Sequence, residues 1–170
     1  MSPPGPFRLK PADSERYVRM RRRMLEDAPW AFAASVEDDV ALDAGHMTKA
    51  LAGEYNAILA IEAADSRELV AVAGVMRQKR AKFAHRVQMW GVFVEAAQRG
   101  RGLGKAVVKA ALEFTRSWQG VDFVDVAVGE KSLHAKRLYE SLGFEAWGRE
   151  PEATDCDGSR YDEFHMTLRL

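Results

Sequence analysis

Three glycines at alternate positions, Gly100, Gly102 and Gly104, follow an apolar segment and open the most regular helical pattern of the chain. Residues 87–94 before them are typical of a strand, and apolar residues from 102 to 118 recur at the helical spacing. Because glycine has no side chain, the backbone can turn tightly there and expose its N–H groups. With the positive end of the helix dipole and the charges of Arg99, Arg101 and Lys105, the sequence predicts a site for phosphate oxygens.

Two common phosphate-binding motifs do not fit this loop. A Walker A loop needs glycine at position 99 and Ser or Thr at position 106, where the chain has Arg99 and Ala106. The dinucleotide motif G-x-G-x-x-G would need glycine at position 105 or 107. A plain flexible turn remains an alternative, but three cations beside three glycines argue against it.

The rest of the chain predicts an α+β fold with a mixed, mostly antiparallel, twisted sheet of about seven strands flanked by about four helices. The expected strands are 7–10, 57–61, 69–76, 87–94, 121–128, 144–149 and 161–170. The expected helices run from Asp13 or Ser14 to before Pro29, from 35 to about 53, from 102 to 118 and from 133 to 142. We expect one domain over residues 1–170, with a loose leader at 1–6.

Composition excludes several other classes of protein. Lys plus Arg and Asp plus Glu both number 25, so a formal net charge of zero argues against a dedicated nucleic-acid binder. No apolar run approaches the roughly 20 residues that span a bilayer, and the N-terminus lacks the apolar core of a signal peptide. We therefore predict a cytoplasmic protein without a membrane partner. Cys156 is the single cysteine and the four histidines lack metal-ligand spacing, so no metal site is predicted.

The glycine loop resembles the pyrophosphate-binding signature R-x-x-G-x-G of the GNAT N-acetyltransferase superfamily, read here as Arg99-Gly-Arg-Gly-Leu-Gly104. A second segment, Ser132-Leu-His-Ala-Lys-Arg-Leu-Tyr-Glu-Ser-Leu-Gly-Phe144, is similar to the N-x-x-A-x-x-L-Y-x-x-x-G-F element of that superfamily. The order of elements from residue 56 onward also agrees. The resemblance implies an acetyl-CoA-dependent enzyme that acetylates amines by direct transfer in a ternary complex.

The resemblance also assigns roles to individual residues. The loop would hold the pyrophosphate, the strand at 92–94 would offer main-chain groups to the pantetheine, and a bulge aided by Gly91 would splay this strand from the one near Val126. Tyr139 would lie near the thioester sulfur and protonate the departing thiolate, as the only catalytic residue that we assign. The implied acetyl-CoA contacts are Val92, Phe93, Val94, Arg99, Gly100, Arg101, Gly102, Leu103, Gly104, Lys105, Ser132 and Tyr139.

Two positions depart from the family pattern. Ser132 replaces the asparagine of the second element, where it can still cap the helix and reach a pantetheine carbonyl. Gln88 falls where some relatives have a glutamate general base, and an amide cannot accept a proton. The other ionisable groups that we weighed as the base are each better explained as ordinary surface groups. They are Glu37, Asp38, Asp39, Glu62, Glu95, His85 and His134.

The acceptor is a small-molecule or peptide amine whose identity the sequence does not give. Trp30, Phe32 and Trp90 are candidates for its pocket, although a core role fits them equally well. Because Gln88 leaves the base unassigned, a non-catalytic acyl-CoA-binding or regulatory domain remains the alternative function. The last strand, 161–170, is expected at an edge of the sheet, where a second copy could pair, so a homodimer is predicted.

Overall fold

The computed structural model describes residues 4–170, which form an open seven-stranded sheet with four α-helices. The strands are β1 (Phe7–Arg8), β2 (Asn56–Glu62), β3 (Leu69–Arg77), β4 (Arg86–Val94), β5 (Phe123–Gly129), β6 (Glu145–Cys156) and β7 (Ser159–Arg169). The helices are α1 (Ser14–Asp27), α2 (Ala44–Leu51), α3 (Leu103–Arg116) and α4 (Leu133–Glu140). The strand order is β1-β2-β3-β4-β5-β7-β6, and only β4 and β5 are parallel, so the predicted mixed α+β fold is confirmed.

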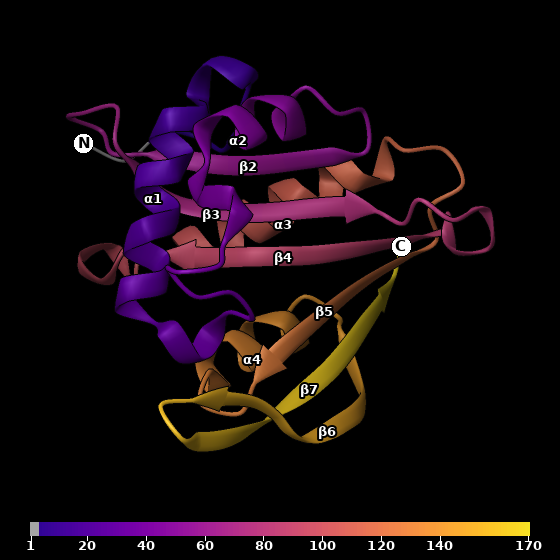
Figure 1. Ribbon diagram of the computed structural model, residues 1–170. Coiled ribbons are helices and arrows are strands. Elements are labelled where there is room, and N and C mark those ends of the chain that lie inside the picture. The colour runs from indigo at the N-terminus through magenta and orange to yellow at the C-terminus, as the bar shows by residue number, and fades with distance from the viewer. Residues whose placement is uncertain (1–3) are drawn as a thin grey trace.

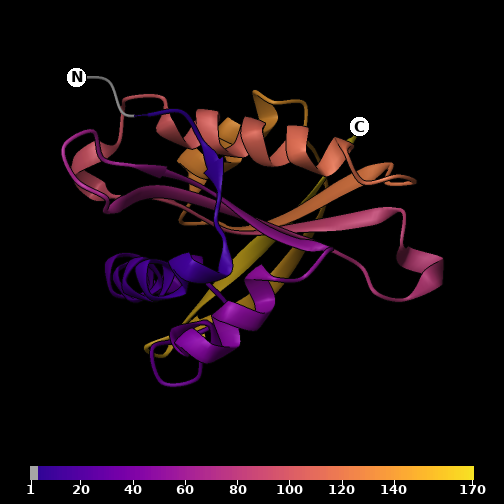
Figure 2. The ribbon, with the colours of Figure 1, turned by 90° about the horizontal axis from the view of Figure 1, so that it is seen from above.

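The helices cover opposite faces of the sheet (Figure 1 and Figure 2). On one side, called here the α1 face, Tyr17, Met20 and Met24 of α1 and Met47 of α2 pack against strand residues that include Val72. On the other side, called the α3 face, α3 and α4 cover a second apolar cluster. β2 and β3 are therefore buried on both faces, which explains the continuous apolar run in β3.

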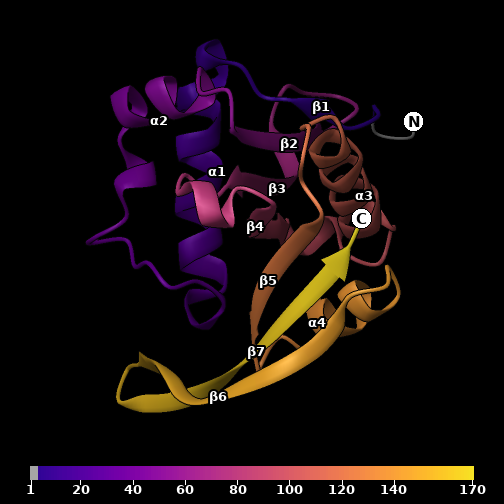
Figure 3. The same ribbon diagram turned by 90° about the vertical axis from the view of Figure 1, so that its right-hand side faces the viewer.

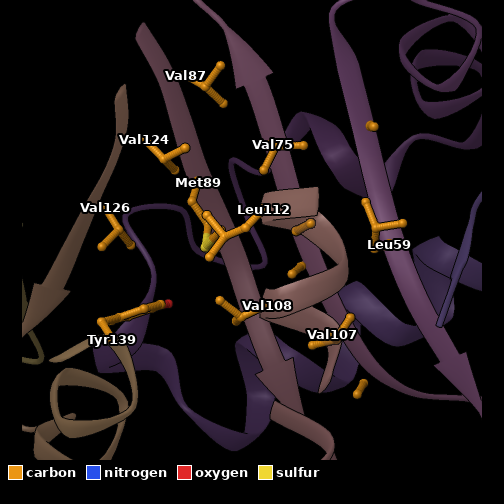
Figure 4. Packing of buried hydrophobic residues seen from close by; sticks show 14 of the residues in the cluster. Leu59, Val75, Val87, Met89, Val107, Val108, Leu112, Val124, Val126 and Tyr139 are labelled. Atoms are coloured by element: carbon orange, nitrogen blue, oxygen red, sulfur yellow. The ribbon is translucent and has the colours of Figure 1, made fainter. Parts of the chain in front are cut away.

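Helix α3 forms for the reason that its sequence predicts. Its apolar residues fall on one side at the helical spacing, and Val107, Val108 and Leu112 point toward the strands, near Met89 of β4 (Figure 4). Val107 and Val108 are fully buried. Burial of such a side chain contributes roughly 1.5–3 kcal/mol, so this packing fixes the helix, and with it the glycine loop, on the sheet.

Strands β4 and β5 pair over a short stretch and then separate, as Figure 1 shows. Their parallel register covers Arg86–Gln88 of β4 and Phe123–Asp125 of β5. Beyond it, two β4 residues, Gly91 and Val92, stand opposite the single β3 residue Ala73, which makes a β-bulge. Gly91 has a positive φ of 58°, a conformation that favours glycine. The predicted splay of these two strands is confirmed.

The second predicted helix, 35–53, is too long. Residues 44–51 are α-helical, whereas residues 40–42 form a separate 3₁₀ turn. Two aspartates break the stretch because each accepts a hydrogen bond from the backbone two or three residues later: Asp39 from the N–H of Ala41 and Asp43 from the N–H of His46. Side chains that cap a turn in this way start a new helix instead of continuing one.

The last strand is not at an edge, which corrects the expectation on which the dimer prediction depended. β7 lies between β5 and β6, and within the described residues β1 and β6 form the edges. The exposed edge of β6 carries the charged residues Arg149 and Glu152, a proline at position 151 and two register shifts toward β7. Features of this kind hinder pairing with another strand.

The described residues bear on two further expectations. Of the predicted loose leader, residues 1–3 lie outside the described part, and residues 4–6 have no regular secondary structure. Within residues 4–170, no helix has the length and apolar character that crossing a membrane requires.

Candidate functional site

A cavity of about 620 Å³ occupies the gap between β4 and β5. It begins at the glycine loop, runs between the two separated strands, and reaches residues on both faces of the sheet. Leu103 and Tyr139 line it from the α3 face, whereas Trp30 and Phe32, after α1, line it from the other face. The wall of the cavity is therefore built from residues on both faces of the sheet.

The glycine loop forms the first part of the wall with an open backbone. Gly100 and Gly102 have positive φ values of 76° and 78°, and a Cβ added to either would meet no atom within 4 Å. Gly102 is the N-cap of α3, so the first N–H groups of the helix, from Leu103 onward, have no acceptor within the helix. Gly104 is different, because its Cβ would lie 3.4 Å from Leu138 and 3.5 Å from Val94. The absence of a side chain at Gly104 therefore allows α3 to pack closely against Leu138 and Val94.

The three cations of the loop differ in their positions. Arg99 lines the cavity, donates from Nε to the carbonyl of Val94 at 3.0 Å and forms an ion pair with Asp27 at the end of α1. Arg101 donates to Gln98 instead, and neither Arg101 nor the exposed Lys105 lines the cavity. The sequence predicted all three as phosphate-binding charges, but in the structure only Arg99 of these three lines the cavity.

The strand residues Val92, Phe93 and Val94 all line the cavity. Because β4 pairs with β5 only as far as Gln88, the main-chain groups of these residues that face β5 are not used in the sheet. Phe93 packs into the cluster on the α1 face, whereas Val92 and Val94 pack against the cluster on the α3 face. Apart from the carbonyl of Val94, which accepts a hydrogen bond from Arg99, the strand thus presents an edge toward the cavity that no strand pairs with.

Tyr139 reaches the cavity from α4. It is 3% exposed, its ring packs edge-to-face on Phe144 at 5.4 Å, and in Figure 4 its hydroxyl points from α4 toward β4. Burial raises the pKa of the hydroxyl well above its ordinary value, so it stays protonated at neutral pH. Within the described residues the hydroxyl makes no hydrogen bond.

Ser132 also lines the cavity and is 6% exposed. It occupies the N-cap position of α4, but its hydroxyl makes no capping hydrogen bond, so the expected cap is wrong. The aromatic residues Trp30, Phe32 and Trp90 all line the cavity, and Phe32 and Trp90 also pack against the core. Phe32 and Trp90 therefore belong both to the cavity wall and to the core, and Trp30 lines the cavity.

Most of the carboxylates that we weighed as the base are bound to other groups. Glu95 pairs with Arg23, Glu62 with Arg16, and Asp39 with Arg21. Asp38 accepts hydrogen bonds from the backbone and hydroxyl of Ser35, and Glu37 does not line the cavity.

None of the remaining candidates is placed as a base on the α1 side of the cavity either. His85 packs edge-to-face on Phe123, away from the cavity, and Gln88 donates to the neighbouring carbonyl of Met89. His134 lines the cavity from α4, on the α3 face. The wall of the cavity thus contains no carboxylate on the α1 side apart from Asp27, which Arg99 neutralises.

The model of the acetyltransferase (GNAT) family matches residues 19–144, which include β4, the glycine loop and all of α4. The chain belongs to the GNAT acetyltransferase family. Among curated relatives, an uncharacterised protein of Mycobacterium leprae is 29% identical over 89% of this chain and 37% of its own length. Human N-acetyltransferase 8 is 26% identical over 74% of this chain and 54% of its own. The chain thus spans about a third to a half of these two relatives.

Solved structures share the GNAT fold. A Salmonella typhimurium protein, whose structure contains its cofactor acetyl-CoA, has a TM-score of 0.80 and 19% identity to this chain. The match covers 100% of this chain and 95% of that one. At this level of identity the likeness concerns the fold alone.

Proposed function

We propose that this protein is an acetyl-CoA-dependent N-acetyltransferase, formed by one domain over residues 1–170, that acetylates a primary amine by direct transfer in a ternary complex. The observation that carries the proposal is the cavity between β4 and β5, with its glycine loop at one end. The GNAT family match and the acetyl-CoA in the Salmonella structure support the same function. A cavity lined from both faces of the sheet suits a reaction in which both substrates are bound together.

The residues present fit a CoA thioester. The space beside Gly100 and Gly102, which an added Cβ would enter freely, leaves room for the pyrophosphate against the backbone donors of Leu103–Lys105. Arg99 adds charge at the same end, and Arg101 stands nearby on the surface. The unpaired edge of Val92–Val94 offers main-chain groups to the pantetheine, and Ser132 offers a hydroxyl that no cap uses.

Acetyl-CoA supplies an activated acyl carbon, and the protein must supply a neutral amine and a proton for the thiolate. An alkyl amine has a pKa near 10.4, so roughly one molecule in a thousand is nucleophilic at neutral pH. Tyr139 is the acid of the proposal, because its protonated hydroxyl points into the gap. Its raised pKa makes it a weak acid, but the same buried surroundings also raise the pKa of a thiol.

The acceptor amine, from a small molecule or a peptide, would enter from the α1 face past Trp30 and Trp90. We propose neither a metal nor a nucleic acid as a partner. A homodimer stays a prediction, and sedimentation at tens of micromolar checks it. A non-catalytic acyl-CoA-binding domain is the second candidate function, and Gln88, in place of a base, is the observation that favours it.

Release of free thiol from acetyl-CoA in the presence of a panel of primary amines tests the proposal. Turnover with any amine supports catalysis, whereas tight CoA binding without turnover favours the binding domain. Thermal unfolding checks the ligand separately. CoA and acetyl-CoA should raise the melting temperature by mass action, and ATP and NAD far less. Equal stabilisation by all of them would reject the combined pyrophosphate and pantetheine site.

A further inference from the structure

Three ionisable side chains gather on the β6–β7 pair, outside the wall of the cavity. A ring nitrogen of His165 and one carboxylate oxygen each from Glu150 and Glu163 all lie within 4.8 Å of one another. Nε2 of His165 lies 2.9 Å from Oε2 of Glu150, and the ring of Trp147 packs against the imidazole at 5.4 Å. The imidazole is therefore fixed on two sides, by a carboxylate and by an indole.

The register of the sheet places this group beside the reaction gap. His165 pairs with Ala127, and Glu163 pairs with Gly129, and both partners line the cavity. The adjacent residue Met166 is buried in the cluster on the α3 face. Since side chains alternate along a strand, His165 and Glu163 point to the α1 face, from which the acceptor amine would enter.

Charged and ionisable groups surround His165 on its face of the sheet. Burial and the nearby Glu150 raise the pKa of the Glu163 carboxyl, while the charge of His165 opposes that rise. On the same strand face, Tyr161 accepts a hydrogen bond from Lys131.

The neighbouring strand β5 contributes one further charged group to this face. Asp125 of β5 is bound by Arg86 and by Thr167. Nδ1 of His165 has no hydrogen-bond partner among the described residues.

We propose that His165, held by Glu150, accepts through water the proton that the acceptor ammonium must lose before it attacks. This inference rests on the proposed acetyl transfer. The backbone of His165 lies one strand beyond that of Ala127, a strand spacing of about 4.8 Å, so the ring stands outside the wall of the cavity and water carries the proton to it. Oε2 of Glu150, 2.9 Å from Nε2, holds the ring in place. His165 would thus act as the base that Gln88 cannot provide.

The protons of the reaction balance. The ammonium gives one proton to His165, which passes it to solvent, because the imidazole is 31% exposed. The neutral amine then forms the C–N bond while the C–S bond breaks. Tyr139 protonates the thiolate, and the second proton of the amine leaves through water and restores the Tyr139 hydroxyl. The net products are the amide, the free thiol and one proton.

The experiment compares His165→Gln and Glu150→Gln with the control His46→Gln, which changes an exposed histidine on α2. The acceptor is an alkyl amine from the panel, and kcat/KM is followed against pH together with CoA affinity. We expect His165→Gln to lower kcat/KM about 10²-fold at neutral pH. The loss should shrink as the pH approaches the pKa of the amine, about 10.4, where half of the amine is already neutral. Glu150→Gln should give a smaller loss of the same form, and CoA affinity should not change.

An acceptor of low pKa provides a second arm. The hydrazide analogue of the same amine is neutral at neutral pH, so wild type and His165→Gln should acetylate it equally well. A loss of equal size at every pH and with both acceptors would mean a structural role, and no loss would remove His165 from the reaction. Either result, with active wild type, overturns this inference alone. A wild type inactive with every amine overturns the proposed acetyl transfer as well.

Discussion

Gly74 of β3 lies directly beneath the indole of Trp90 on β4. A Cβ added at Gly74 would stand 2.5 Å from Cε2 of that indole, closer than real Cβ contacts come. The two residues are cross-strand partners in the β3–β4 register. The missing side chain therefore allows the indole to lie flat on the sheet while it lines the cavity.

Gly74→Ala tests this arrangement. The added methyl group must displace Trp90, so we expect a loss of roughly 1–3 kcal/mol in the free energy of unfolding, measured in urea. If the indole also contacts the acceptor, KM for the amine should rise. Gly148→Ala is the matched control, since its Cβ would lie 3.9 Å from the nearest side chain. Equal stability of both variants would mean that Trp90 moves without cost.

Gly102→Ala tests the glycine loop against a closely matched control, Gly158→Ala. Both glycines have φ values near +77°, and a Cβ at either would meet no atom within 4 Å. The backbone strain should therefore be similar, about 1–2 kcal/mol. Only Gly102 borders the cavity. Calorimetry should show at least tenfold weaker CoA binding for Gly102→Ala, a drop of about 1.4 kcal/mol, and unchanged binding for the control.

Tyr139→Phe tests whether the Tyr139 hydroxyl is the acid that protonates the thiolate. The ring keeps its packing on Phe144, and the hydroxyl has no hydrogen-bond partner among the described residues, so stability should change little. If the hydroxyl protonates the thiolate, kcat should fall about 10² to 10⁴-fold at unchanged acetyl-CoA affinity. Steady-state rates and binding measured on both proteins give the answer. Wild-type turnover in the variant would assign the proton to water or to another group.

Asp13 should contribute to resistance against acid. Although partial burial acts in the opposite direction, hydrogen bonds from the Lys10 N–H and from Arg16 lower the pKa of the Asp13 carboxyl. The unfolded chain then binds the proton more readily, so this stabilisation is complete above the unfolded pKa of about 3.9 and is lost as the pH falls through the folded value.

Asp13→Asn should accordingly be less stable than wild type at neutral pH, and the difference should shrink below about pH 4. Urea unfolding from neutral to acid pH measures it. Asp65→Asn, at an exposed turn position, is the control and should show no such trend. A difference that stays constant down to the lowest pH would mean that the carboxylate charge of Asp13 does not matter.

Local patterns were enough to predict the elements around the cavity. The alternate glycines and the apolar periodicity after them are short-range signals, and the loop and α3 lie where they indicate. The bulge at Gly91 followed from the family resemblance. The lack of a paired strand beside Val92–Val94 is a consequence of that bulge, and it could be foreseen from the same resemblance.

Features that join distant parts of the chain could not be predicted in this way. Strand order depends on which hairpin packs best, so alternation within 161–170 could not tell an edge strand from the internal strand β7. The ion pair between Arg99 and Asp27 joins two segments with unrelated local patterns. Glu163 and His165 share one face of β7, but Glu150 belongs to a bulged strand, whose irregular register the sequence pattern does not reveal.

The two parts of the sheet in Figure 3 meet at β4 and β5 through only three residue pairs. A ligand that fills the gap touches both parts, and at a hundredfold excess over its Kd it stabilises the folded state by about 2.7 kcal/mol. With a CoA thioester or CoA as that ligand, as we propose, the β4–β5 junction should be the part of the sheet whose resistance to proteolysis rises most when the ligand is added.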